Sequence, residues 1–290
     1  MSTAPSSLSP SPGPAPWRQL FLEHVEAMAS PEFVLSTIRR TKSPSAAAGG
    51  VVHAPRARTC IFRGLFAELP VNSKNDAELN PGVYESDFTT FTTDCRMDKM
   101  AELFGVVEGE DGDEGQKLKG SGGGAPVEMV FWVKESGTQW RLRGKAYVLA
   151  PDVETSTEGE KVISTLVARM RRKSPDEEWS FSREITAHFG NLSPLMRGSF
   201  RNPPPGTLVA VPVEDDRLRL GQKVTSLDDE VARANFRVVV VVPDEVDRTD
   251  LSDPERGRRW RYTFVGDGKA ESTTLGGLVE NGWQKVETWP

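Results

Sequence analysis

Basic and hydroxyl side chains gather in the stretch ESDFTTFTTDCRMDKM, residues 85–100. The β-branched and aromatic run at 88–93 predicts a strand, and Asp94 after it suits the start of a helix. The next turns carry Arg96 and Lys99, where acidic residues would normally favour a helix start. Together with the hydroxyls of Thr92 and Thr93, these cations could donate to the oxygens of a phosphate. The alternative interpretation is a capped surface helix with two solvated cations.

Two more arginines, Arg58 and Arg63, flank the apolar sequence TCIF. Their separation of five positions places them on opposite faces of an ideal strand. Both can therefore reach one pocket only if the strand bends or if one of them lies beyond its end. The alternative interpretation is that they are the solvated ends of a core strand, since arginine is mostly exposed in folded proteins.

A third group of polar residues follows the strand-like sequence TQWRLRGKAYV. Its alternation puts Gln139, Arg141, Arg143 and Lys145 on one face. Such a row of polar residues is commonly the solvent-exposed face of a strand. A buried glutamine in this position could instead hydrogen-bond to the edge of a planar ring.

Residues 1–16 alternate serine, proline and small residues, a composition that predicts a disordered tail because it buries too little apolar surface. The sequence WRQLFLEHVEAMA then has the spacing of an amphipathic helix. Residues 41–56 are rich in Pro, Ala and Gly and predict a loop. The charged and glycine-rich residues 109–124 predict a flexible insertion, which we place within 107–126.

Strand-like runs dominate the remainder of the chain. VEMVFWVK and TQWRLRGKAYVL, separated by ESG, predict a hairpin. Residues 158–172 and REITAHFG predict helices, whereas ANFRVVVVVPDEV, RRWRYTFVG and WQKVETWP predict strands. The excess of strands over crossover helices favours a mainly β fold, an antiparallel barrel with peripheral helices, over a doubly wound parallel sheet.

Composition narrows the class of protein further. The 36 basic and 42 acidic residues give a net charge of -6, which argues against a nucleic-acid or anionic-membrane protein. The basic residues 169–173, RMRRK, are therefore interpreted as the solvated end of a helix. Two cysteines and three scattered histidines provide neither a disulfide framework nor a zinc site. No apolar run could cross a bilayer and no secretory signal is apparent, so a cytoplasmic protein is expected.

The ordered set RTCIFR, FTTDCRMDK, TQWRLRGKAYV and RWRYTF resembles the pyridoxamine 5'-phosphate oxidase-like FMN-binding split-barrel family across residues 17–290. The similarity is greater to a poorly characterised branch of FMN-binding-domain proteins of fungi and bacteria. The resemblance implies a homodimer of split barrels, with FMN in a cleft at the dimer interface. Residues 17–290 would then be one FMN-binding split-barrel domain.

The resemblance also implies which residues contact FMN. The arginine that begins the family's Arg-x-x-x-x-Lys strand matches Arg58, and Arg63 replaces the lysine. The family's Tyr-Thr pair falls on Thr92 and Thr93, so its aromatic residue is absent. Of the family's Ser-Arg-Lys only Lys99 is kept, with Arg96 as a substitute for the arginine, and the family's flavin-contacting glutamine and C-terminal arginine match Gln139 and Arg261.

Substrate chemistry transfers less well from the family. The Arg-x-His element of true pyridoxamine phosphate oxidases has no counterpart in ERGRRWR, and Ser193 and Arg197 are only the nearest candidates for contacts to a substrate phosphate. The expected function is an FMN-dependent oxidoreductase that acts on an unidentified small molecule. The alternatives are a noncatalytic flavin-binding or flavin-sensing protein and a split barrel that binds haem or another anionic planar ligand. No residue is nominated as a catalytic acid or base.

Overall fold

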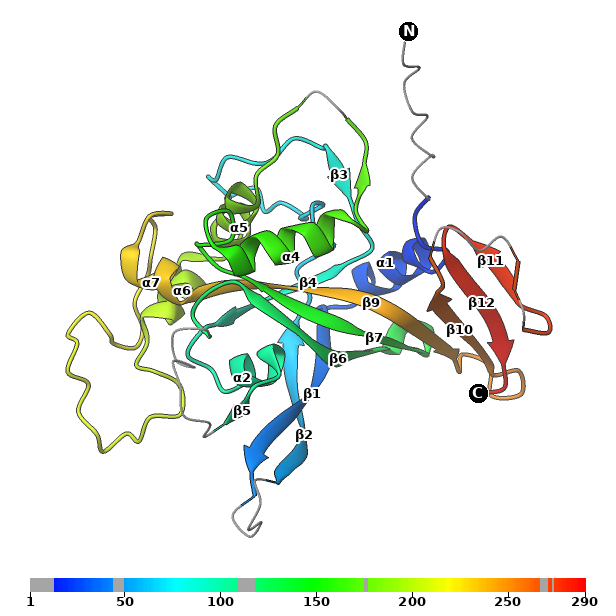
Figure 1. Cartoon of the computed structure of the whole chain (residues 1–290), viewed down its shortest axis with the longest axis horizontal. Helices are drawn as coiled ribbons and strands as arrows, with labels where there is room; N and C mark the ends of the chain where they lie inside the picture. The colour runs from blue at the N-terminus through cyan, green and yellow to red at the C-terminus, as the bar shows by residue number, and fades with distance from the viewer. Residues whose placement is uncertain (1–12, 44–49, 109–117, 175–176, 267–270, 273) are drawn as a thin grey trace, which may run out of the picture.

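The computed structural model describes residues 13–43, 50–108, 118–174, 177–266, 271–272 and 274–290 (Figure 1). Its largest unit is one antiparallel sheet that runs across the whole molecule. Neighbouring strands follow the order β11 (Leu278–Glu280), β12 (Trp283–Thr288), β10 (Arg258–Phe264), β9 (Phe236–Asp250), β7 (Thr138–Leu149), β6 (Gly122–Val133), β1 (Glu32–Lys42) and β2 (Val51–Ile61).

Four short strands complete the described β-structure. β4 (Thr89–Asp94) pairs antiparallel with the first half of β9, and β5 (Val107–Glu108) pairs parallel with the end of β1. β3 (Tyr84–Glu85) and β8 (Arg171–Arg172) form a separate two-stranded sheet. The predicted mainly antiparallel β fold is therefore confirmed.

The helices are peripheral, and several of them gather at one end of the molecule (Figure 1). α1 (Arg18–Glu26) lies between the barrel and the β10–β12 end of the sheet. The others are α2 (Lys99–Phe104), α4 (Thr157–Val167), α5 (Phe181–Gly190), α6 (Pro194–Gly198) and α7 (Glu230–Asn235), with 3-10 turns η1 (Lys134–Ser136) and η2 (Ser199–Arg201). Among the described residues no helix is both long and apolar enough to span a membrane.

β9 contains five consecutive valines, although strands of an antiparallel sheet commonly alternate apolar and polar residues. Val239 and Val241 belong to the barrel core, with Phe91, Met129, Phe131 and Trp140. Val238, Val240 and Val242 belong to a second core beneath the helices, with Val162, Ile185, Phe189 and Phe236. Because successive strand residues point to opposite faces, a strand buried on both faces is apolar without alternation. β9 thus joins the barrel to its helical cover.

Element boundaries differ from the prediction in three places. β1 and β2 extend into the loop that was predicted at 41–56, so the described hairpin is longer. The helix predicted over 158–172 ends at Val167. Gly122–Val133 forms β6 and Val107–Glu108 forms β5, so both ends of the predicted insertion carry strands, whereas 109–117 lie outside the described residues.

The interpretation of RMRRK as a solvated helix end was wrong. Arg171 lies in β8 and is buried, and its guanidinium donates to Asp87 at 2.6 and 3.0 Å and to Glu85 at 2.7 Å. Arg18 also pairs with Asp87, and the backbone N–H of Ala15 donates to it at 3.2 Å. Residues of the predicted N-terminal tail thus pack onto the domain from Gly13 onward, while residues 1–12 lie outside the described part.

Candidate functional site

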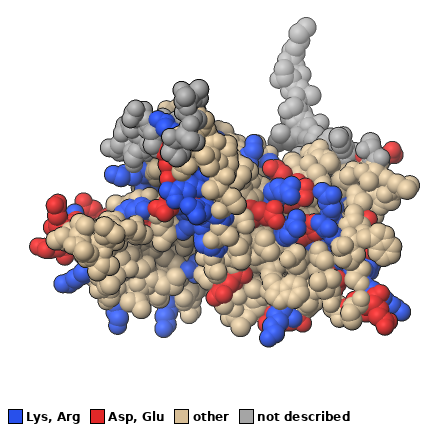
Figure 2. Space-filling view, turned by 90° about the horizontal axis from the view of Figure 1, so that it is seen from below, with Lys and Arg blue, Asp and Glu red and all other residues tan. Residues whose placement is uncertain are grey.

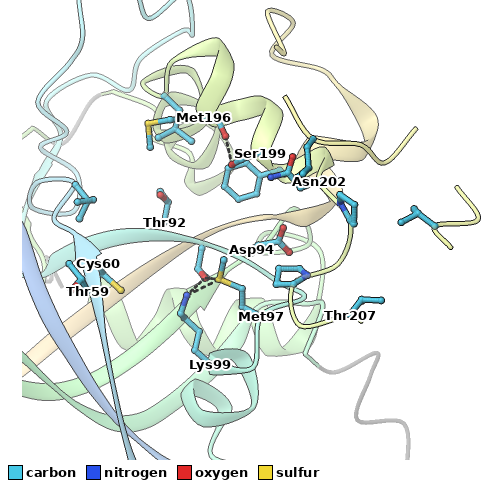
Figure 3. Close-up of a pocket in the computed structure, with 18 of the residues that line it drawn as sticks. Thr59, Cys60, Thr92, Asp94, Met97, Lys99, Met196, Ser199, Asn202 and Thr207 are labelled. Carbon is cyan, nitrogen blue, oxygen red and sulfur yellow. Dashed lines mark hydrogen bonds between the residues drawn. The ribbon is translucent and has the colours of Figure 1, made fainter. Parts of the chain in front are cut away.

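A cavity of about 690 Å³ opens where β2, β4 and α6 approach one another (Figure 3). From the strands it is lined by Thr59, Cys60, Ile61, Thr92, Thr93 and Asp94. Leu192, Met196, Ser199 and Phe200 form the side near α6. Much of the remaining wall comes from residues 203–220, which we call the strap. A volume of this size is typical of small-molecule sites.

A second cavity of about 490 Å³ adjoins the first. Its basic lining residues are Arg39 on β1, Arg56 and Arg58 on β2, and Lys99. The two cavities share Met97, Lys99 and Pro205, so Lys99 stands at their junction. Figure 2, which views the molecule from the side on which the β1–β2 hairpin lies, shows Lys and Arg gathered in dense groups on this face.

Lys99, the first residue of α2, is largely buried at this junction. Its Nζ donates to Thr93 Oγ1 at 3.1 Å and contacts Met97 Sδ at 2.9 Å (Figure 3). Burial, together with the nearby Arg58, lowers the pKa of Lys99. Within the described part of the chain no carboxylate forms an ion pair with Lys99. A buried ammonium of this kind is stabilised by an anion.

Arg63 lines the larger cavity from a position two residues beyond the end of β2. Its backbone N–H donates to the carbonyl of Thr90 at 2.8 Å, which fixes it beside β4. Burial lowers the pKa of this guanidinium, and its Nε is buried without a hydrogen-bond partner. In the described residues Arg63, like Lys99, has no carboxylate in an ion pair.

Arg58 lines the smaller cavity, and its charge is partly balanced. One Nη donates to Glu102 Oε2 at 2.5 Å, and the other hydrogen-bonds to Thr37 Oγ1. Glu102 is buried on α2 and also accepts from Thr37. This arrangement holds the Arg58 guanidinium at the wall of the cavity while leaving part of it exposed to the cavity.

Arg96 is placed differently from the other predicted phosphate ligands, because it lines neither cavity. Its guanidinium donates to Asp94 at 2.6 and 2.9 Å and to the carbonyls of Phe200 and Asn202 at 3.2 and 3.0 Å. Asp94 also accepts from the Arg96 backbone N–H at 2.8 Å, so it closes a turn instead of capping α2. Arg96 therefore ties the end of β4 to the segment that directly precedes the strap.

Gln139 and Arg261 lie outside both cavities. Gln139, the second residue of β7, pairs with Trp132 and Thr249, whereas Arg261 lies on β10 and forms an ion pair with Glu245 at 3.6 Å. Both positions belong to the part of the sheet near β10 and β12, away from α6 in Figure 1. Within one chain, the structure does not bring these two residues to Lys99.

The two predicted substrate ligands also lie outside the lining of the larger cavity. Ser193 caps α6 by accepting the backbone N–H of Met196 at 3.3 Å. Arg197 is buried, donates to the carbonyl of Thr225 at 3.0 Å, and has its guanidinium carbon 5.9 Å from the centroid of the Phe189 ring. The neighbouring Met196 and Ser199 face the cavity instead.

Sequence reasoning missed the strap, which supplies the most lining residues of any segment. Its members at the larger cavity are Pro203, Pro205, Thr207, Leu208, Val209, Val211, Val213 and Leu220. The signal was present in PPPGTLVAVPV, where leucine and valine recur in a segment too rich in Pro and Gly for a regular element.

Residues 14–150 match the family model described as the FMN-binding domain of pyridoxamine 5'-phosphate oxidase. This match covers the FMN-binding domain, which is somewhat less than half of the chain. The matched FMN-binding domain contains Arg58, Arg63, Thr92, Thr93 and Lys99, whereas the strap and Arg261 lie beyond it.

The chain also resembles individual proteins over nearly its full length. It is 20% identical to the uncharacterized protein YGR017W of Saccharomyces cerevisiae, over 95% of this chain and 98% of that protein. The crystal structure of a pyridoxamine 5'-phosphate oxidase-related, FMN-binding protein of Nostoc punctiforme has a TM-score of 0.51 at 17% identity and covers 96% of this chain and 100% of its own. This likeness shows a shared split-barrel fold. PhzG of Burkholderia lata matches with a TM-score of 0.37 at 15% identity, over 98% of each chain.

Proposed function

We propose that this chain binds FMN across the two adjoining cavities and acts as an FMN-dependent oxidoreductase. The observation that carries the proposal is the pair of partly buried cations, Lys99 and Arg63, which line the cavity and form no ion pair with a carboxylate among the described residues. An isolated buried charge is costly unless it is paired. The family match supports FMN as the anionic group.

The residues present fit the parts of FMN. Lys99, Thr93 and Arg58 would hold the phosphate at the junction, since Lys99 and Arg58 line the smaller cavity and Thr93 bonds to Lys99. Arg63 would lie toward the flavin ring, where a cation favours the extra electron density of the reduced form. Arg96 is assigned as a positioning residue, because its donors already engage Asp94 and the carbonyls at 200 and 202.

FMN, when bound, supplies the electron transfer, and the protein supplies binding and electrostatics. The strap and α6 would shield the larger cavity from water. A noncatalytic flavin-binding protein is the second candidate, favoured by the C-terminal arginines. Arg258 pairs with Glu287 at 2.8 Å and Arg259 with Asp247 at 2.5 Å, so neither is free to orient a substrate phosphate.

The preference for FMN over riboflavin tests the proposed site. Riboflavin lacks the phosphate, and each hydrogen bond to a charged group contributes about 1.5–3 kcal/mol. Titrations followed by quenching of flavin fluorescence should therefore give an affinity for FMN on the order of 100-fold higher. Equal affinities would place the phosphate outside the protein and contradict this assignment.

We also propose that the active form is a homodimer, because Gln139 and Arg261 could then reach the flavin held by the partner. The outer edge of β2 supports an interface, since no described strand pairs with it and its Val51 and Val52 are 39% and 45% exposed. Light scattering should report about twice the chain mass of 31.9 kDa. A monomer that binds FMN stoichiometrically at all concentrations would contradict the proposal.

A further inference from the structure

The strap presents apolar side chains that lack a full set of contacts. Leu208 is 72% exposed, Val211 50% and Leu220 75%, although all three line the larger cavity. Single exposed leucines and valines are normal, but apolar side chains that gather in one exposed patch mark a binding surface. Their position on a cavity wall indicates that the missing contact is a ligand.

The opposite wall of the cavity is apolar too. It is formed by Leu192, Met196 and Phe200 around α6, and Met196 is 41% exposed. Charged lining side chains in the described part are confined to the strand side, at Arg63, Asp94 and Lys99. Asp94 is already held by Arg96, and the proposed function assigns both cations to FMN. The space between strap and α6 therefore offers no charge to a second molecule.

The strap is fixed at its C-terminal end, so this part of the wall is preorganised. Gln222 donates to the carbonyls of Arg217 and Arg219 at 2.9 and 3.0 Å, and Arg219 donates through its backbone to Arg201 at 3.0 Å. Gly198 of α6 approaches so closely that a Cβ there would lie 1.9 Å from the carbonyl oxygen of Gln222. Both anchors join the strap to the α6 side of the cavity.

We propose that the second molecule is an uncharged, largely apolar compound held between the strap and α6, with the side chains of Asn202 and Thr207 as its neutral polar partners. This inference rests on the proposed function, since FMN is taken to occupy the strand side of the same cavity. It names the class of substrate that the protein selects: a small apolar ring or chain without phosphate or carboxylate. Burial of apolar surface would supply most of its binding energy.

A matched pair of probes tests the inference, namely naphthalene-2-methanol, which is neutral, and 2-naphthoate, which is anionic. Each is titrated by calorimetry into FMN-loaded protein, with the flavin absorption bands as a second readout. The neutral probe should bind at least about tenfold more tightly than the anion, because transferring a carboxylate into an apolar space is costly. Leu208→Asp should weaken the neutral probe by at least about tenfold.

Leu275→Asp is the matched control, because Leu275 is 99% exposed and lines neither cavity. It should leave probe binding unchanged. FMN affinity and solution mass are measured on every variant. Three results would overturn this inference while leaving the proposed function intact. They are tighter binding of 2-naphthoate than of the neutral probe, no binding of the neutral probe to FMN-loaded protein, and an equal loss of probe affinity in Leu275→Asp and Leu208→Asp.

Two other outcomes concern the role of the strap and of the cofactor. Loss of the dimer in Leu208→Asp would show that the strap covers a second copy of the chain, and this would overturn the inference. A wild-type chain that binds no FMN would overturn the proposed function and the inference with it. The FMN titration, performed first, therefore separates the two failures.

Discussion

Lys99→Ala should reduce the affinity for FMN by roughly 10- to 100-fold, the largest effect expected from any single change in the site. The Lys99 ammonium is partly buried between the two cavities and donates to Thr93, and it forms no ion pair with a carboxylate of the described residues. Removing it takes away a charge-assisted contact to the proposed phosphate. Fluorescence titration with FMN measures the effect.

Riboflavin is the internal reference for this variant, because its affinity should hardly change in Lys99→Ala. Lys161→Ala is the matched control, since Lys161 is exposed on α4 and pairs with Glu158, which is exposed to a similar extent. An equal loss of riboflavin and FMN affinity would point to general damage to the fold. Wild-type FMN affinity in Lys99→Ala would remove Lys99 from the site.

Titration of Lys99 should also appear in the pH dependence of FMN binding. Burial lowers the pKa of Lys99, so its charge is lost at a lower pH than that of an ordinary lysine. FMN affinity should consequently fall as the pH rises into the alkaline range, and this fall should be absent from Lys99→Ala.

Asp87→Ala should lower the free energy of unfolding by about 3 kcal/mol or more. Asp87 accepts two hydrogen bonds from the buried Arg171, one from the backbone of Ala15, and pairs with Arg18 at 3.4 Å. Its loss leaves buried donors from three segments with fewer acceptors. Urea unfolding followed by tryptophan fluorescence measures the change.

The control for this prediction is Asp244→Ala. Asp244 also pairs with an arginine, Arg169 at 2.9 Å, but its side chain is 56% exposed. Surface pairs of this kind contribute at most about 1 kcal/mol. Similar losses of unfolding free energy in the two variants would show that the buried contacts between Asp87 and Arg171 do not stabilise the fold more than a surface pair does.

The fold was predicted from the local pattern of apolar and polar residues, and the prediction succeeded where this pattern reflects which side chains are buried. The strand-like runs VEMVFWVK and TQWRLRGKAYVL predicted the β6–β7 hairpin, and the valine run at 238–242 predicted a strand, which the structure shows to be β9, buried on both faces. The spacing of Arg58 and Arg63 allowed both to reach one pocket if one of them lay beyond its strand. Arg63 does lie beyond β2, but the two arginines line different cavities.

Features that depend on distant partners could not be read from the sequence. Whether Arg96 faces an anion or a carbonyl depends on Asn202, more than a hundred positions away. Arg171 looked like the solvated end of a helix because its acceptors, Glu85 and Asp87, come from a segment far earlier in the chain. The apolar residues of the strap do not recur with the period of a helix or a strand, so their pattern did not predict a cavity wall. The shape of the strap is set instead by hydrogen bonds and contacts to α6 and to Arg201.

The absorbance spectrum of the purified protein, with chromatographic identification of the pigment released on denaturation, tests the central claim most directly. A flavin spectrum with one FMN per chain is the predicted result, either as isolated or after incubation with FMN and desalting. A colourless protein that retains no FMN after loading, or a released pigment that is haem or another compound, would contradict the account.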